Sequence, residues 1–477
     1  MFEGASDGGS RISEPRPLMP RPRERILADR TDLKSKTGEF YLENVMISRS
    51  LDGVKPGTIK KLMVMETLPK PVNYTGGMDP LSYGGTFTLT RYLGTVPVED
   101  DGSAYFKVPA LRPVFFIALD AEGRAVKRMQ SFTQVMPGER QGCVGCHERK
   151  TENTVRRAAT VSKAISRGPS EIDASGLVVD VPEFPRDMQP VLDRSCVKCH
   201  NPDVRKAGLD LCGDRGPMYS MGYLGLILWG QVLDGRNLAE SDWPPYARGS
   251  GGSPLMKKID GSHHGVKVSE RDRRMVMQWL DASAPYAGTY AALGSGFIGG
   301  HKSHRPYNST WGRAPNVPAH QTVKSRCEAC HTTPHTVSDG TPIRFRDKND
   351  PRNGRAGRYS RHLIFNLTRP EKSMYLMAPL AKEAGGLGLC TNAQGKAVFA
   401  TKEDPGYAKL LAVVEDAKKM LDADPRFDMP NFCPNQEYIR EMKRYGILPQ
   451  DADPARCRID PYDVDRRYWS LDWTDLK

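Results

Sequence analysis

The stretch Thr95-Val-Pro-Val-Glu-Asp-Asp-Gly-Ser-Ala-Tyr-Phe-Lys-Val108 carries the strongest hairpin signal in the chain. Two runs rich in β-branched and aromatic residues flank an Asp-Asp-Gly-Ser segment. Glycine adopts the positive φ angles that tight turns between strands require. We therefore expect the two runs to pair as an antiparallel β-hairpin.

Similar runs extend this pattern on both sides of the stretch. Short apolar runs alternate with Asp-Gly or Gly turns, which is typical of an all-β sandwich. The runs cover residues 39–47, 58–66, 86–92, 104–108, 114–119 and 126–135. The sequence predicts an antiparallel β-sandwich of about 100 residues.

Residues 184–290 change to a helical pattern. Met188, Val191 and Leu192 form an apolar stripe that leads into a pair of cysteines. Further along, Ser269-Glu-Arg-Asp272 resembles a capping box that opens a helix. This order of helix, cysteine pair, loops and closing helix is the layout of a small cytochrome c fold. Two more helices are expected over residues 407–421 and 435–445.

Six of the ten cysteines fall into three copies of Cys-x-x-Cys-His. At this spacing two thiols can bond covalently to a haem while the following histidine ligates its iron. Structural zinc sites usually join two such pairs about 15–20 residues apart, and these copies are farther from one another. The motifs therefore predict three covalent c-type haems, with zinc or a disulfide as the alternative for any one copy. The copies are Cys143-Val-Gly-Cys146-His147, Cys196-Val-Lys-Cys199-His200 and Cys327-Glu-Ala-Cys330-His331.

Seven further histidines are candidates for the second iron ligand of each haem. His263 and His264 lie in the loop before the closing helix of the second haem region. His335 follows the third motif, and His362 begins an apolar run. Imidazole in place of methionine lowers the reduction potential of a haem. The alternative is that these are polar surface histidines, as it is for His301, His304 and His320.

Four cysteines lie outside the motifs. In an oxidising compartment they would form up to two disulfides, and a zinc site is the alternative. They are Cys212, Cys390, Cys433 and Cys457.

Composition and charge restrict the partners. The chain has 477 residues, with 69 Lys and Arg against 57 Asp and Glu, a net charge of +12. No basic block or nucleic-acid motif occurs, so we expect an acidic redox partner rather than nucleic acid, with a solvated mixed surface as the alternative.

No stretch of about 18 apolar residues could span a bilayer. Residues 1–25 lack the apolar core of a signal peptide, whereas haem attachment of this kind takes place outside the cytoplasm. We therefore expect an extracytoplasmic piece of a longer precursor.

The predicted fold class is multidomain α+β, with an N-terminal antiparallel β-sandwich followed by mostly α-helical, cytochrome c-like haem domains. An extended arm covers residues 1–37, and the sandwich covers 38–150 and ends in the first haem motif. A cytochrome c-like domain with the second haem covers 181–290. A helical region with the third haem covers 291–477.

The chain resembles the hydrazine synthase alpha-subunit family, the multihaem c-type cytochromes of anammox and other planctomycete-like bacteria. The resemblance lies in short unusual segments around the haem motifs and in the C-terminal region. These are residues 93–98, 101–110, 137–139, 143–148, 253–255, 263–264, 366–373, 378–386, 428–430 and 441–446.

The resemblance implies a β-propeller upstream of the sandwich. It also implies an oxidoreductase complex with beta and gamma subunits, in a periplasm or an anammoxosome-like compartment, that joins nitric oxide and ammonium to hydrazine. In the anammox family the alpha subunit has two haem motifs, one followed shortly by a tyrosine ligand. Here there are three motifs, and no tyrosine occurs within ten residues after any of them.

We therefore expect a trihaem cytochrome for electron transfer, and two alternatives stay open. One is a catalytic subunit that binds nitric oxide or another small nitrogen compound at an open haem, with catalytic residues unknown. The other is a β-sandwich docking module with structural haems.

Overall fold

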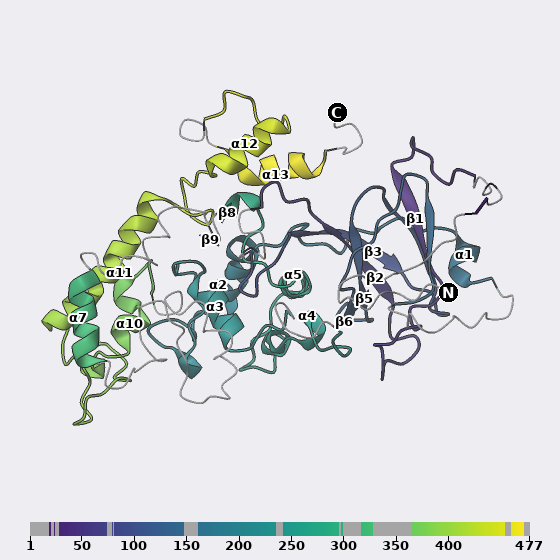
Figure 1. Cartoon of the computed structure of the whole chain (residues 1–477). Coiled ribbons are helices and arrows are strands. Elements are labelled where there is room, and N and C mark those ends of the chain that lie inside the picture. Colours follow the sequence, from purple (N-terminus) through teal and green to yellow (C-terminus); the bar gives the residue numbers. More distant parts are fainter. Residues whose placement is uncertain are drawn as a thin grey trace.

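The structure is a computed structural model of the chain. It describes residues 19–20, 23, 28–73, 79, 81–146, 161–234, 242–294, 297–298, 316–327, 365–453 and 459–471. Figure 1 shows the two larger β-sheets at one end and mostly helices over the rest of the molecule. The α+β arrangement with N-terminal sheets followed by helices is thereby confirmed. Most of the predicted arm over 1–37 lies outside the described residues.

The N-terminal part contains two sheets that pack face to face. The first sheet has the order β4-β1-β7, and the second has the order β3-β2-β5-β6. Every pair is antiparallel except β1 with β7, which is parallel, so the prediction of an entirely antiparallel sandwich is wrong at that pair. The strands are β1 (Thr37–Leu42), β2 (Lys61–Thr67), β3 (Thr90–Pro97), β4 (Ala104–Pro109), β5 (Val114–Leu119), β6 (Ala125–Arg128) and β7 (Arg140–Cys143).

The expected hairpin over residues 95–108 is wrong, although its turn is present. The Glu99 N–H donates to the Ser103 carbonyl at 2.8 Å, and Gly102 has the positive φ of +84°. The two flanking strands, β3 and β4, nevertheless belong to different sheets. Each strand pairs with another partner, and the chain crosses between sheets here, so that Val96 and Phe106 enter one shared core.

The second sheet is buried on both faces. Its inner face packs on the first sheet through an apolar core that includes Phe40, Val64 and Phe106. Its outer face carries Met65 and Phe115, which belong to a second cluster completed by Ala282 from the helical part. The sheet is therefore the middle layer between the first sheet and the helices. This explains why β2 has a continuous buried run instead of alternation.

Helices predicted from the sequence are confirmed in three places. Ser269 caps the helix over Glu270–Asp281, because its hydroxyl accepts the Asp272 N–H at 3.1 Å. Helices also cover the expected segments near residues 407–421 and 435–445, and Asn435 caps the second of them.

Beyond the sandwich the described elements are mostly short helices. They are α1 (Lys163–Arg167), η1 (Phe184–Met188), α2 (Gln189–Ser195), η2 (Lys206–Gly208), α3 (Met221–Leu228), α4 (Gly249–Gly252), η3 (Pro254–Lys258), α5 (Glu270–Asp281), η4 (Tyr290–Ala292), α7 (Asn316–Arg326), η5 (Pro370–Lys372), α10 (Met374–Met377), η6 (Lys382–Ala384), α11 (Pro405–Ala423), α12 (Gln436–Arg444) and α13 (Pro461–Trp469). A two-stranded ribbon joins β8 (Leu293–Gly294) and β9 (Phe297–Ile298).

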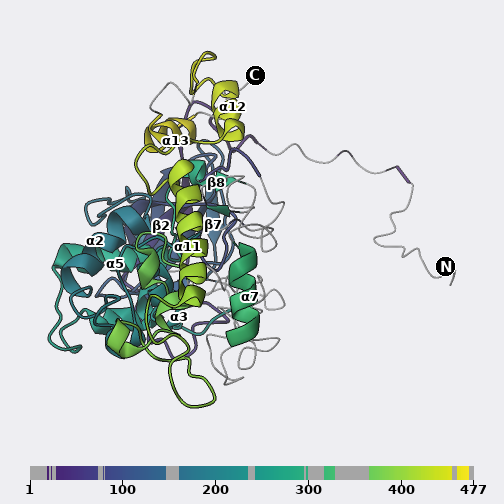
Figure 2. The same ribbon diagram turned by 90° about the vertical axis from the view of Figure 1, so that its left-hand side faces the viewer.

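Two apolar cores organise these helices. The larger one surrounds Phe184, Tyr223 and Trp279, and it includes residues of α12 and α13 from the far end of the sequence. The other holds α7, α10 and α11 together through residues such as Leu376 and Val414. Figure 2 shows α11 and α7 side by side, with α12 and α13 grouped at one end.

Candidate functional site

The second Cys-x-x-Cys-His motif is the one that the structure describes completely. Helix α2 ends at Ser195, where the Cys196 N–H donates to the Leu192 carbonyl at 2.7 Å, and a turn follows. The His200 N–H donates to the Cys196 carbonyl at 3.0 Å. Both cysteines and the histidine are thus set on one turn.

The loop after the motif orients the His200 ring. Nδ1 of His200 lies 3.0 Å from the carbonyl oxygen of Lys206, so that Nδ1–H can donate to it and Nε2 points away as the available ligand atom. Arg205 and Ala207 on either side have positive φ angles of 43° and 55°. Such angles are uncommon outside glycine and cost energy. The backbone is therefore strained on both sides of Lys206, whose carbonyl fixes the imidazole.

A second imidazole faces His200 from another part of the chain. Residues 260–267 form a small loop closed by the bridge between Asp260 and Lys267. The Val266 N–H donates to the His263 carbonyl at 2.9 Å. The rings of His263 and His200 are 6.2 Å apart between centroids, and their planes differ by 17°.

The fold thus brings two imidazoles, which are common metal ligands, next to each other from separate segments of the chain. Burial comes first among the causes that lower the pKa of His263, followed by the charge of Lys258 and by the two neighbouring imidazoles. The neutral imidazole is the form that ligates metals. His264 is the exposed neighbour and has a positive φ of 49°.

The first motif is anchored on the sandwich. Cys143 is the last residue of β7 and lies opposite Leu42 of β1 in the parallel pair. The Glu43 N–H donates to the Cys143 carbonyl at 2.9 Å. A Cβ atom at Gly145 would lie 2.0 Å from the Ile47 carbonyl oxygen, so only glycine fits at position 145.

The third motif is described only at its first residue. Cys327 follows α7, and its N–H donates to the Val323 carbonyl at 2.8 Å. The remaining predicted ligands lie outside the described residues. They are His147, Cys330, His331, His335 and His362.

Of the four cysteines outside the motifs, Cys212 is a buried thiol outside any disulfide, so at most one of the up to two expected bridges remains. Burial, then the charges of Asp210 and Asp214, raise its pKa to about 12. Cys457 lies outside the described residues. Over the part of the chain that the structure describes, no group of three His, Cys, Asp or Glu side chains is placed to hold a metal.

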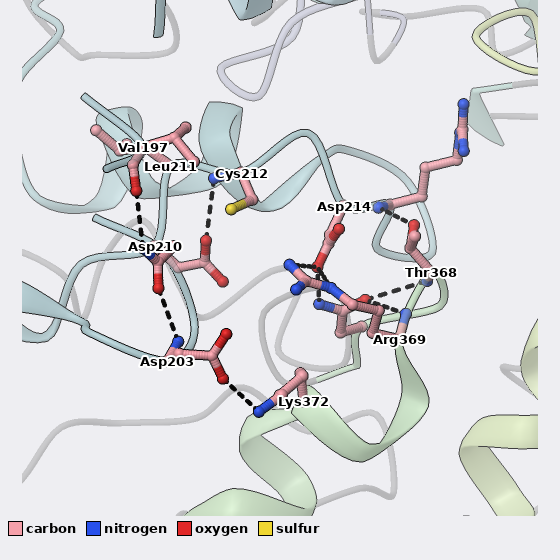
Figure 3. Close-up of polar contacts among 12 residues, drawn as sticks. Val197, Asp203, Asp210, Leu211, Cys212, Asp214, Thr368, Arg369 and Lys372 are labelled. Carbon is pink, nitrogen blue, oxygen red and sulfur yellow. Dashed lines mark hydrogen bonds and ion pairs between the residues drawn. The ribbon is translucent and has the colours of Figure 1, made fainter. Parts of the chain in front are cut away.

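A polar network joins the second motif to the C-terminal part, and the sequence did not predict it. Asp214 accepts hydrogen bonds from Asn366 Nδ2 at 2.6 Å and Arg369 Nε at 2.8 Å. Figure 3 shows Arg369 reaching Asp214 and Lys372 reaching Asp203, the latter pair 2.5 Å apart. In the sequence, the segment 366–373 is distinguished only by its resemblance to the hydrazine synthase alpha-subunit family. The structure shows that it holds the loops after His200.

A second contact reinforces this junction. The buried Arg426 forms an ion pair with Asp428 at 2.8 Å and donates to the Gly216 carbonyl at 2.8 Å. Tyr286 donates to the Asp428 carboxylate at 2.8 Å. The charge of Arg426 is tolerated in the interior because the guanidinium is paired with a carboxylate and donates to a backbone carbonyl.

A cavity of about 380 Å³ lies between the sandwich and the helices, away from the His200–His263 pair. Phe115, Trp243 and Asp281 are among the residues that line it. Burial raises the pKa of the Asp281 carboxyl to about 7, although the N–H and hydroxyl of Ser250 donate to it. No residue of a Cys-x-x-Cys-His motif lines this cavity.

Fold and site together define the class of protein: a β-sandwich that carries one Cys-x-x-Cys pair at its edge and packs on a helical unit in which a second motif faces His263. Residues 57–148 match the family model described as the hydrazine synthase alpha subunit middle domain. The resemblance to the hydrazine synthase alpha-subunit family is thereby confirmed, over a segment that runs from before β2 to just past the first motif.

Among solved structures, the chain is similar to hydrazine synthase from Kuenenia stuttgartiensis. The two are 16% identical, the TM-score is 0.39, and the alignment covers 53% of this chain and 43% of that chain. The match thus spans less than half of that protein. No curated protein sequence matches the chain. Across the described residues, no helix is long and apolar enough to cross a membrane.

Proposed function

We propose that this protein is a trihaem c-type cytochrome that transfers electrons as the haem-bearing part of a hydrazine synthase alpha-like complex. Haems would be attached at Cys143 and Cys146, Cys196 and Cys199, and Cys327 and Cys330. Partners would be beta- and gamma-like redox subunits in an extracytoplasmic compartment. The family match to residues 57–148 and the three motifs support this proposal.

The opposed rings of His200 and His263 are the observation that carries the electron-transfer role. A haem supplies a one-electron couple, and its ligation decides between electron transfer and the binding of a small molecule. At the second motif, His200 and His263 are the two imidazoles that would ligate the iron of a bound haem. His200 is held by the Lys206 carbonyl, and His263 is held by the 260–267 loop. With both imidazoles bound, that haem would transfer electrons and would not bind a substrate.

The alternative is a catalytic role at another haem, with one axial position open to nitric oxide. One set of spectra separates the two functions. We expect the pyridine haemochrome spectrum to give three haems per chain, and we expect the reduced protein to keep a low-spin spectrum under carbon monoxide and nitric oxide. A gas-binding haem in the unmodified protein would support the catalytic role instead. Absence of covalent haem would overturn both.

A further inference from the structure

The segments that present His200 and His263 also carry a cluster of lysines. Five lysines lie within six residues of one or the other imidazole, and all five are exposed. No ion pair involves any of the five over the described part of the chain. They are Lys198, Lys206, Lys257, Lys258 and Lys267.

Few negative charges oppose this cluster. Within residues 196–208 and residues 256–268, the acidic side chains are Asp203 and Asp260. Lys372 of the C-terminal part neutralises Asp203 at 2.5 Å, as Figure 3 shows. The nearby Asp272 forms an ion pair with Arg194 at 2.8 Å. The surface around the two histidines is therefore strongly positive.

Apolar side chains lie beside the lysines. Val204 is 48% exposed and Trp229 is 36% exposed. Trp229 Nε1 donates to the Ala207 carbonyl at 3.3 Å, which fixes its ring against the loop that contains Lys206. Cys199 is exposed on the same loop region, so one edge of the second motif faces solvent. An exposed tryptophan whose ring is held in place is a residue type enriched at protein interfaces.

We propose that this lysine surface, formed by the five lysines with Val204 and Trp229, is the docking site for an acidic redox protein. The positive cluster attracts a negative partner over a distance, and the apolar side chains make the contact that orients it. The exposed Cys199 edge of the second motif then lies at the interface. This inference rests on the proposed function, because it uses haem at that motif.

The test measures both binding and electron transfer with a defined probe, an acidic plant-type [2Fe–2S] ferredoxin. The variant K257E/K258E/K267E reverses three charges of the lysine surface. The matched control K396E/K402E/K409E makes the same change of net charge at exposed lysines in the C-terminal part. Both are prepared as haem-loaded protein, and haem content and thermal unfolding are compared with the original chain. The neutral variant K257Q/K258Q/K267Q gives an intermediate charge state.

We expect the surface variant to reduce the second-order rate constant of haem reduction by the ferredoxin at least about tenfold at low salt. Its dependence on ionic strength should flatten, and the dissociation constant should rise in parallel. The control should stay within about twofold, and the glutamine variant should lie between. Equal effects in both triple variants, or no effect in either, would overturn the docking site.

Failure of the proposed function has a different signature. In that case no variant, nor the original chain, carries covalent haem, while binding of the ferredoxin can still be measured by calorimetry. Normal haem content with binding that ignores the lysine surface would overturn only the docking site. Stronger binding of a duplex DNA than of the ferredoxin to the same lysines would also contradict it.

Discussion

The imidazole rings of His200 and His263 face one another at 6.2 Å, 63 positions apart in the sequence. Two separate structural features place the two rings opposite each other. The Lys206 carbonyl fixes the ring that follows the cysteine pair, and a short loop between η3 and α5 presents the other. An ion pair between Arg194 of α2 and Asp272 of α5, at 2.8 Å, links the two halves.

Removal of the His263 imidazole should leave the haem of the second motif with one protein ligand fewer. In His263→Ala we expect the reduced protein to bind carbon monoxide at one more haem than the original chain does, because the ligand opposite His200 is lost. Added imidazole should restore the original spectrum. His264→Ala is the matched control and should leave gas binding unchanged. The reverse result, with His264 as the sensitive residue, would contradict the assignment.

The cysteines of the second motif should determine haem content. In C196S/C199S, pyridine haemochrome analysis should give two covalent haems per chain instead of three, because both attachment points are absent. Cys212→Ser is the control, since Cys212 is a buried thiol outside the motifs, and it should retain all three. A full haem count in the double variant would show that this motif does not attach haem.

Gly145 should tolerate no side chain. In Gly145→Ala the new Cβ would lie 2.0 Å from the Ile47 carbonyl oxygen, which is backbone and cannot move cheaply. We expect the free energy of unfolding of the sandwich to fall by about 1–3 kcal/mol, with reduced haem at the first motif. Gly142→Ala in β7 is the control, because a Cβ there meets no atom within 4 Å. Denaturant unfolding followed by circular dichroism, together with haem content, would measure both, and equal stability of the two variants would refute the clash.

Loss of Asp214 should loosen the C-terminal part. Asp214→Ala leaves Arg369 and Asn366 without their shared acceptor, so we expect stability to drop by about 1–3 kcal/mol. Hydrogen exchange should accelerate in residues 365–373. The exposed pair of Lys418 and Asp422 is the comparison, and Asp422→Asn should cost no more than about 0.5 kcal/mol. Unchanged exchange in 365–373 would mean that apolar packing alone holds the segment.

Glu183 should make stability depend on pH. Burial raises the pKa of its carboxyl to about 7, although Arg186 opposes the shift and Tyr462 and the Gly288 N–H donate to it. The folded state then binds a proton that the unfolded state has released, so stability falls as pH rises from about 4.5 to about 7 and is level above that range.

The measurement is the difference in unfolding free energy between the original chain and Glu183→Gln across this range. Relative to the variant, the original chain should lose roughly 2–3 kcal/mol between the two ends of the range. Replacement of the exposed Glu415 by glutamine is the control and should show no such trend. A flat difference for Glu183→Gln would contradict the raised pKa.

Local sequence signals predicted much of the fold where the cause was local. The Ser269 cap and the apolar face of α5 depend on residues within one or two turns, so they could be seen in the sequence. The turn at Gly102 could also be seen, because its geometry is set by a few residues. The partners of β3 and β4 could not be predicted in this way. Strand β3 pairs with β2 and strand β4 pairs with β1, and both choices depend on contacts between distant segments.

The same division holds at the site. The Cys-x-x-Cys-His spacing marked Cys196, Cys199 and His200, and the histidine pair at 263–264 stood out before the closing helix. The choice of His263 over its neighbour required the fold, because adjacent residues in a loop can point in different directions. The ion pair of Asp214 with Arg369 could not be predicted from the sequence. The two residues are 155 positions apart, and no local pattern links residues at such a separation.

The sequence by itself determined the covalent chemistry that is expected, because attachment of haem needs only two thiols and a histidine at fixed short spacing. It also determined the succession of sheets and helices, which follows from local periodicity. Only the tertiary structure decided which imidazole lies opposite His200, which strands share a sheet, and that α12 and α13 pack with the second motif's helices. These outcomes depend on contacts between distant segments, whose energies are balanced over the whole chain and are not encoded in any one stretch of it.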